Sequence, residues 1–301
     1  MRLSLRANGV SEAISKPRSP RPCGAREDKR KCIKTLFLLF SFPFFLSSVF
    51  AQTPGFDHSL FDQFLKKVVN ERGEVNYPAA AQDPSLLKDY LEKLKQVDEA
   101  ALRQQWPREE KLAFWINAYH AGIIQAVLNH YPVKSLLEIP SVWDIDAVQV
   151  GSHHYSLNNL RQRELIGVFR DEKIDTALAC GARSCPAFSR EAYTGPRVEG
   201  QLFLAAQRFV NDPALNLIEP QAKKIQISKI FKWHAKDFKL DFSSEERDLR
   251  FSEEEYAVLS FLANYLKDES KVQYLEESRY KIKYLDFDWS LNEWRSEGKR
   301  A

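Results

Sequence analysis

The sequence lacks the motifs by which nucleotide-binding proteins and the commonest hydrolases are recognised. It contains no phosphate-binding glycine loop, no dinucleotide-binding glycine fingerprint and no Gly-x-Ser-x-Gly turn. It has only six histidines and four cysteines, and their spacing does not match a structural zinc site. His153 and His154, for example, are adjacent on an expected strand and would point to opposite faces. We therefore expect neither a metal site nor a cofactor.

Long apolar runs are also absent, except for one near the N-terminus. The segment from Thr35 to Phe50 is apolar, follows a strongly basic stretch and leads to small residues that end at Ala51. This pattern is typical of a secretory signal peptide over residues 1–51, with cleavage after Ala51. The run is shorter than the roughly 20 residues of a membrane helix. We therefore expect an exported protein, periplasmic or secreted, with no stable membrane span after cleavage; an uncleaved anchor is the alternative.

Acidic residues outnumber basic ones once this leader is removed. The whole chain has 44 Lys and Arg against 41 Asp and Glu, and residues 1–34 hold ten of those bases but only three of those acids. The rest of the chain therefore has a net charge of about −4. The basic character of the full sequence belongs to the leader, so we expect no nucleic-acid partner.

Residues 52–301 show helical and strand patterns that alternate without a regular βαβ order. Apolar spacing predicts helices at 56–69, 84–97, 109–130, 156–165, 196–211, 229–238 and 253–267. Strands are expected in a hairpin over 142–155 that turns at Gly151, then at 174–180, 215–218, 224–227 and 280–285. We predict an α+β fold, one large domain in which a helical N-terminal part packs on a small mixed or antiparallel sheet.

Cys180 and Cys185, the only cysteines beyond the leader, flank a turn that also carries Arg183. A thiol held at the end of a buried strand beside a guanidinium is readily ionised and reactive. Export to an oxidising compartment instead favours a disulfide between the two cysteines. The sequence leaves both interpretations open. The first predicts a thiol-dependent hydrolase or acyl transferase, and the second a non-catalytic binding or envelope-scaffold module.

The helix expected at 109–130 is apolar nearly all round between Leu112 and Leu128, which predicts burial on every side. Asn117 and His120 lie three residues apart on it and share a face. In the enzyme hypothesis Cys180 is the nucleophile, His120 the base and Asn117 the polarising group. The alternative, which we favour, is an amide and a core histidine that bond to nearby backbone, because buried polar groups need partners whatever their function.

Other polar residues would complete a pocket beside the cysteine turn. Arg183 would anchor a substrate carboxylate or, with equal weight, pair with an acid such as Asp175. Tyr119, His234 and Asp237 are further candidates for substrate binding, although an acid at a helix end such as Asp237 more often caps the helix. The ligand would be a small molecule or a peptide of unknown identity.

Several segments together resemble the domain-of-unknown-function 547 family. They are Leu112–Tyr119, Tyr131–Ser135, Tyr155–Leu157, the cysteine turn, Glu191–Gly195, Ser228–Trp233 with Asp237-Phe238, and Tyr284–Asn292. The resemblance extends from Phe56 to Asn292 and implies an exported bacterial protein of a family without an established activity.

The chain departs from the family pattern in three places, two single residues and one four-residue segment. This chain has His120 where the family often has Asn, and Asp175 where it often has His. It reads Asn159-Leu160-Arg161-Gln162 where the family often reads Asp-Ile-Glu-His. A mechanism that uses the Asp, Glu or His residues common in the family at these places could not operate in this protein.

Overall fold

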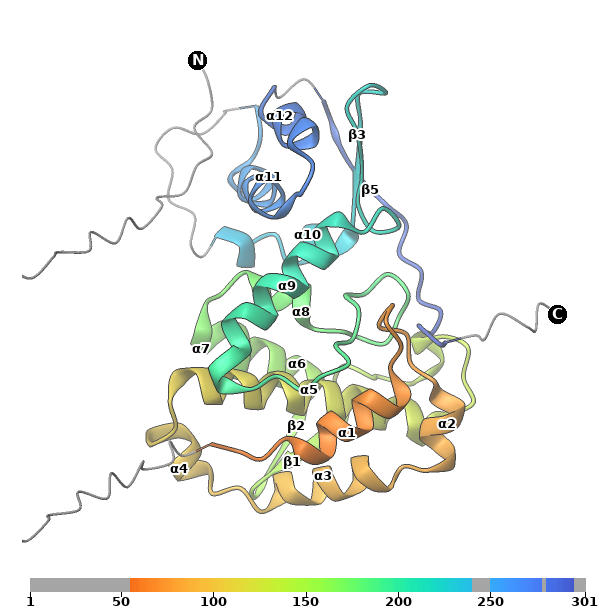
Figure 1. The fold of residues 1–301 in the computed structure, drawn as a ribbon, viewed down its shortest axis with the longest axis vertical. Coiled ribbons are helices and arrows are strands. Elements are labelled where there is room, and N and C mark those ends of the chain that lie inside the picture. The colour runs from red at the N-terminus through yellow and green to blue at the C-terminus, as the bar shows by residue number, and fades with distance from the viewer. Residues whose placement is uncertain (1–54, 240–249, 278–279, 295–301) are drawn as a thin grey trace, which may run out of the picture. The chain divides into compact units, whose positions relative to one another are not determined.

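The computed structural model describes residues 55–239, 250–277 and 280–294, so the signal peptide expected over residues 1–51 lies outside the described part. All of the described residues fall within one compact unit. Its buried apolar side chains form two clusters, which we call the N-terminal cluster and the C-terminal cluster. Figure 1 shows the elements of the first cluster in its lower half and those of the second in its upper half.

The N-terminal cluster is built around one long helix, α5 (Arg108–His130), whose side chains from Leu112 to Val127 are buried with the exception of Gln125. This confirms the burial that its apolar sequence predicts. The helices that precede it along the chain are α1 (Ser59–Val68), α2 (Tyr77–Gln82), α3 (Ser85–Lys95) and α4 (Glu99–Gln104). In α1 and α3 only one face is buried, as their amphipathic spacing indicates.

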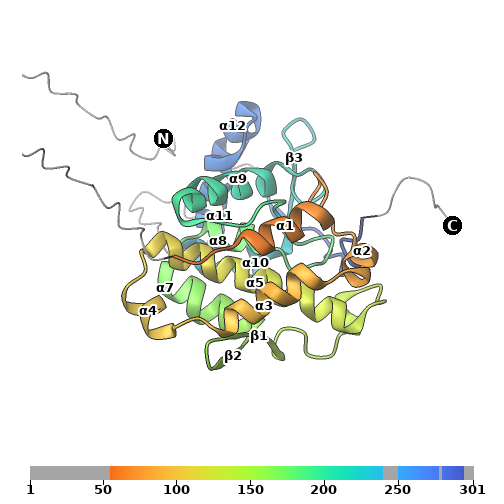
Figure 2. The same cartoon turned by 60° about the horizontal axis from the view of Figure 1, so that its bottom comes forward.

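The predicted hairpin consists of β1 (Asp146–Val150) and β2 (His153–Ser156), which pair antiparallel. Gly151 makes the turn with a φ of +54°. The hairpin packs against α3 and α5, as Figure 2 shows at its lower edge. Ser156 then caps the next helical run by accepting a hydrogen bond from the backbone N–H of Asn159. That run comprises α6 (Leu157–Asn159), the π-helical η2 (Leu160–Ile166) and α7 (Gly167–Phe169).

The prediction of a strand at 174–180 is wrong for the first half of that segment. Lys173–Ala177 form a short helix, α8, and only the residues from Leu178 onward are extended. The buried residues Ile174, Ala177 and Leu178 recur at helical spacing, so the apolar run fits a helix as well as a strand. The Thr176 hydroxyl donates to the Lys173 carbonyl, a local bond that favours the helical conformation. The cysteine turn therefore follows a helix and a short extended segment.

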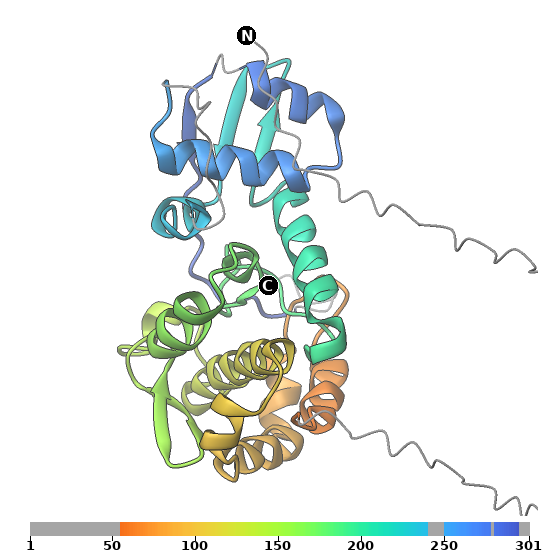
Figure 3. The same ribbon diagram turned by 90° about the vertical axis from the view of Figure 1, so that its left-hand side faces the viewer.

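Helix α9 (Val198–Asn211), preceded by the 3₁₀ turn η3 (Gly195–Arg197), leads into the C-terminal cluster. That cluster contains β3 (Leu217–Glu219), β4 (Lys224–Ile227), α10 (Lys229–Trp233), η4 (Asp237–Lys239), α11 (Glu253–Tyr265), α12 (Glu269–Glu277) and β5 (Ile282–Tyr284). Strand β4 is central, antiparallel to β3 and parallel to β5, and Figure 3 shows α11 crossing one face of this sheet. Two small sheets among many helices confirm the α+β class. Within the described residues no helix has both the length and the apolar character that a membrane crossing needs.

The segment 285–294, which we call the C-terminal strap, returns from β5 to the N-terminal cluster. Its backbone bonds to three separate segments: Leu136 N–H donates to Trp289 O, Arg183 N–H to Ser290 O, and Val75 N–H to Asn292 O. The first of these contacts reaches the 3₁₀ turn η1 (Leu136–Glu138), and the second reaches the cysteine turn. The strap thereby ties residues that are more than 100 positions apart in sequence.

We predict that Gly73→Ala destabilises the protein, whereas Gly200→Ala does not. Gly73 has a φ of +71°, and an added Cβ would lie 2.6 Å from the Cβ of Ala187 and 2.7 Å from the Phe188 carbonyl oxygen. Strain at such a position costs on the order of 1–3 kcal/mol. A Cβ at Gly200, inside α9, would meet nothing within 4 Å and would gain up to ~1 kcal/mol of helix propensity. Urea unfolding measures both, and equal unfolding midpoints for the two variants would contradict the prediction.

Candidate functional site

A cavity of about 240 Å³ lies where the two clusters and the C-terminal strap meet. Much of its wall is aromatic: Trp143 comes from the segment before β1, Trp233 from α10, and Phe287 and Trp289 from the strap. Leu157, Leu178 and Ile230 add aliphatic surface. The site is mostly apolar, which is the usual character of small-molecule pockets.

Three of the aromatic rings form a contiguous surface in the cavity wall. The indole centroids of Trp233 and Trp289 are 5.7 Å apart with planes inclined by 26°, and the Phe287 ring lies 4.8 Å from Trp233 and 4.4 Å from Trp289. Trp233 is 46% exposed although it belongs to this group. A large aromatic side chain held in place by two others and still open to solvent presents a ready surface for a flat or bulky ligand.

Arg161 supplies the charge at the polar end of the cavity. Its Nε and Nη2 donate to the two carboxylate oxygens of Asp175, at 2.8 and 2.9 Å, and Nη2 also donates to Asp237 Oδ2. The side chain of Arg161 is 14% exposed, that of Asp175 1% and that of Asp237 22%. The planar guanidinium fits this bidentate geometry, which an ammonium group would not reproduce. Arg161 thus connects α8 to the η4 turn.

Burial shifts the pKa values of two groups in this cavity. Burial raises the pKa of Asp175 to about 7, since the loss of hydration outweighs the attraction of Arg161. Burial lowers the pKa of His234 to about 4, and the nearby Arg161 charge adds to this effect. His234 is therefore neutral at physiological pH and able to donate one hydrogen bond and accept another.

A metal ion would find oxygen and nitrogen donors here, but Arg161 already binds the oxygens. Ligand atoms of Asp175, His234 and Asp237 lie within 4.8 Å of one another. Arg161 donates hydrogen bonds to both carboxylates, so a metal ion would have to displace the guanidinium. The two carboxylates thus form an internal ion pair with Arg161.

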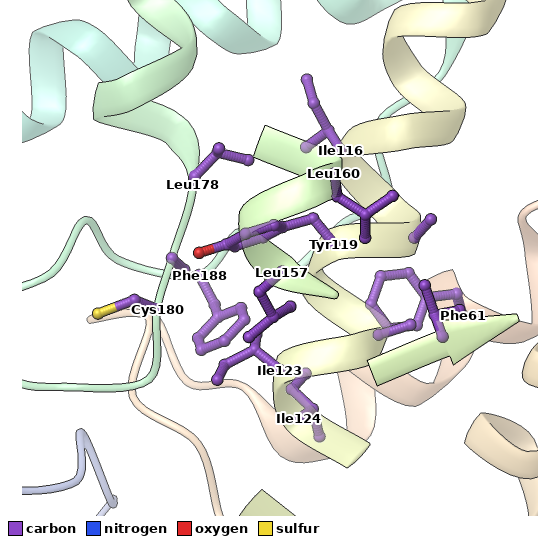
Figure 4. Packing of buried hydrophobic residues seen from close by; sticks show 14 of the residues in the cluster. Phe61, Ile116, Tyr119, Ile123, Ile124, Leu157, Leu160, Leu178, Cys180 and Phe188 are labelled. Carbon is purple, nitrogen blue, oxygen red and sulfur yellow. The ribbon is translucent and has the colours of Figure 1, made fainter. Parts of the chain in front are cut away.

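Cys180 and Cys185 are joined by a disulfide, with their Cα atoms 5.6 Å apart, and both line the cavity. Gly181, with a φ of +86°, lets the chain turn directly after Cys180. Figure 4 shows the Cys180 sulfur directed away from Phe188 and the other labelled core side chains. The bonded sulfurs cannot attack a carbonyl, so the expected Cys180 nucleophile has no thiol in this structure.

Asn117 and His120, the two residues of α5 proposed as catalytic partners of Cys180, bond to other groups. The Asn117 amide bonds twice to the backbone of Tyr193, donating to its carbonyl at 2.8 Å and accepting from its N–H at 2.9 Å. His120 Nε2 accepts from the Ala179 N–H at 3.1 Å. Both side chains are almost fully buried, and neither lines the cavity. Each side chain satisfies backbone that the fold buries, as the structural alternative for these two residues predicts.

The structure brings together three of the four residues expected to bind substrate. Tyr119 and His234 line the cavity, and Asp237 bonds to Arg161 beside it. Arg183 does not join them: it lies in a second cavity, of about 430 Å³, that shares only Cys185 with the first. There it is 4.0 Å from Glu74 and donates to the Glu293 carbonyl, so it makes no pair with Asp175.

The Tyr119 hydroxyl is a polar group of the cavity that has no partner among the described residues. The side chain is 4% exposed, and its oxygen makes no hydrogen bond to any described residue. Figure 4 shows the ring among buried side chains of the N-terminal cluster, with the oxygen directed toward the segment that carries Leu178 and Cys180. A buried hydroxyl ordinarily finds a partner, and this one faces the cavity.

Sequence reasoning did not assign Arg161 or Trp143 to the site. Arg161 was visible only as a departure from the family pattern, and its pairing with Asp175, the second departure, depends on tertiary structure. The signal available was that two opposite charges, 14 residues apart, occur in segments otherwise rich in buried apolar residues.

Residues 103–210 match the family described as "Protein of unknown function, DUF547". This stretch contains α5, Arg161, Asp175 and the cysteine turn, whereas Trp233, His234 and the strap lie beyond it. No curated protein and no solved structure matches the chain. The chain is therefore similar to this family of unknown function over residues 103–210, which supply most of the residues that line the cavity.

Proposed function

We propose that this protein is a non-catalytic binding module that takes a small molecule in the cavity between its two clusters. The observation that carries the proposal is a cavity lined by Trp143, Trp233 and Trp289 together with Tyr119 and His234, whose side chains have spare hydrogen-bonding capacity. Aromatic and aliphatic walls would hold the body of a ligand, and Tyr119 and His234 would orient its polar end.

The disulfide supports binding over thiol catalysis. It makes Cys180 and Cys185 part of the cavity wall, and it closes a short loop whose backbone also bonds to the strap. A rigid wall favours binding, because less conformational entropy is lost when the ligand arrives.

The same bond supports the proposal that the protein works after export. Disulfides persist in secreted and periplasmic proteins and are rare in the reducing cytosol. Together with the signal-peptide pattern before Ala51, it supports our proposal that binding occurs in the periplasm or outside the cell.

We expect the exported protein to resist alkylation by iodoacetamide until it is reduced. Its intact mass should be two hydrogens below that of the free dithiol form, because both sulfurs are bonded. The double variant Cys180→Ser/Cys185→Ser should fold but lose about 2 kcal/mol of stability, as loop-closure entropy predicts for so short a loop. A Cys180 that labels rapidly in the native protein would contradict the binding proposal and restore the thiol-enzyme hypothesis.

Trp233→Ala should weaken ligand binding about tenfold or more, since it removes the most exposed ring of the wall. Indole, phenol, glucose and choline serve as probes, followed by NMR through the side-chain N–H signals of Trp143, Trp233 and Trp289. Trp294→Ala is the matched control, because Trp294 is also exposed, at 40%, and does not line the cavity. If no probe perturbs these three signals, or if Trp294→Ala has the larger effect, the proposal fails.

We predict that Asp175 makes the protein less stable as pH rises toward neutrality. Its pKa is about 7 in the folded state against an ordinary value of 3.8, so between these values only the folded form holds the proton. The stabilisation is complete below about pH 4 and is lost as pH rises through about 7, with a slope of at most ~1.4 kcal/mol per pH unit.

Asp175→Asn is the comparison, because it keeps the shape and cannot titrate. The difference between wild-type and variant unfolding free energies, measured by urea denaturation from pH 4 to 8, should change across this window. A difference that is constant with pH would show that Asp175 titrates alike in the folded and unfolded chains.

A further inference from the structure

The charges at the polar end of the cavity disfavour a negatively charged ligand. Arg161 supplies one positive charge, and its two partners, Asp175 and Asp237, supply up to two negative charges. His234 contributes no positive charge at neutral pH, because burial lowers its pKa to about 4. The group is therefore neutral or negative overall. An incoming carboxylate or phosphate would have to compete with two carboxylates for one guanidinium.

The aromatic wall favours a positive charge on the ligand. The faces of indole and benzene rings carry negative potential, and Trp attracts a cation most strongly. Three tryptophans line the cavity, and two of them, Trp233 and Trp289, lie nearly parallel and share contacts with Phe287. Among the cations of the described chain, only Arg161 lines the cavity, and it is bound edge-on by its two acids.

The Tyr119 hydroxyl can provide one hydrogen bond to such a ligand. The Tyr119 hydroxyl is 4% exposed and has no partner among the described residues. It would accept from, or donate to, a hydroxyl or amine on the ligand. A volume of about 240 Å³ limits the occupant to a molecule smaller than most drugs.

We infer that the cavity selects a small organic cation, an alkylammonium compound with a hydroxyl or similar polar substituent. The inference rests on the proposed binding function and adds the class of ligand. The ammonium group would lie against Trp233, Trp289 and Phe287, and the polar substituent would reach Tyr119. Because Asp175 and Asp237 offset the charge of Arg161, this end of the cavity would not repel the cation, and the aromatic rings would favour it over a neutral molecule of the same shape.

Three probes of nearly identical shape separate charge from fit: choline, its neutral isostere 3,3-dimethylbutan-1-ol, and 3,3-dimethylbutanoate. We expect choline to bind about tenfold tighter than the alcohol, as cation–π attraction and one unit of charge predict, and the carboxylate to bind least. Isothermal titration calorimetry on the mature, disulfide-bonded protein, at fixed ionic strength, measures all three affinities.

Two variants test whether the charge of Asp237 and the hydroxyl of Tyr119 contribute to binding as we infer. Asp237→Asn should reduce the preference of choline over the alcohol, measured as the ratio of their two affinities, because it removes a negative charge beside the cavity. Tyr119→Phe should weaken choline and the alcohol equally, since both carry the hydroxyl. Trp294→Ala should change neither affinity.

Equal or tighter binding of the alcohol would overturn the inference and leave the binding function intact. Preferred binding of the carboxylate would also overturn it and would assign Arg161 as an anion anchor. If none of the three probes binds, the inference fails, and the NMR experiment with indole, phenol and glucose decides the binding function separately.

Discussion

The ion pair between Arg161 and its two acids is the interaction on which the site depends. Asp175 lies on α8 in the N-terminal cluster, and Asp237 lies on η4 beside Phe238 of the C-terminal cluster. Burying these charges costs several kcal/mol for each ion before pairing repays it, so the arrangement persists only with near-ideal geometry. The pair consequently fixes how the two clusters face each other, and the cavity lies at that junction.

The same pair joins two of the positions at which the chain departs from the pattern that it resembles. Arg161 and Asp175 lie 14 residues apart in sequence and form an ion pair in the folded chain. The third departure, His120, accepts a backbone bond from Ala179. None of the three leaves an unpaired buried charge, which is the condition for such substitutions to be tolerated.

The sequence predicted the helices and strands well where the spacing of apolar residues fitted only one of them. It predicted them poorly where the spacing fitted both a helix and a strand. The all-apolar pattern of α5 has no strand equivalent at that length, whereas Ile174–Leu178 satisfied both periods and proved helical at its start. Buried Asn117 and His120 behaved as the requirement for hydrogen-bond partners indicates. The cavity could not be derived, because Tyr119, Trp143, Trp233 and Trp289 meet only through long-range packing that no local pattern encodes.

The C-terminal strap has a consequence for the order of events during biogenesis. Phe287 and Trp289 complete the aromatic wall, and the strap backbone holds Arg183 and Val75 in place. Translation delivers the chain from its N-terminus, so every earlier element is present while this wall is still open. The cavity is thereby complete only once residue 294 has emerged, and the disulfide can form before the strap covers the cysteine turn.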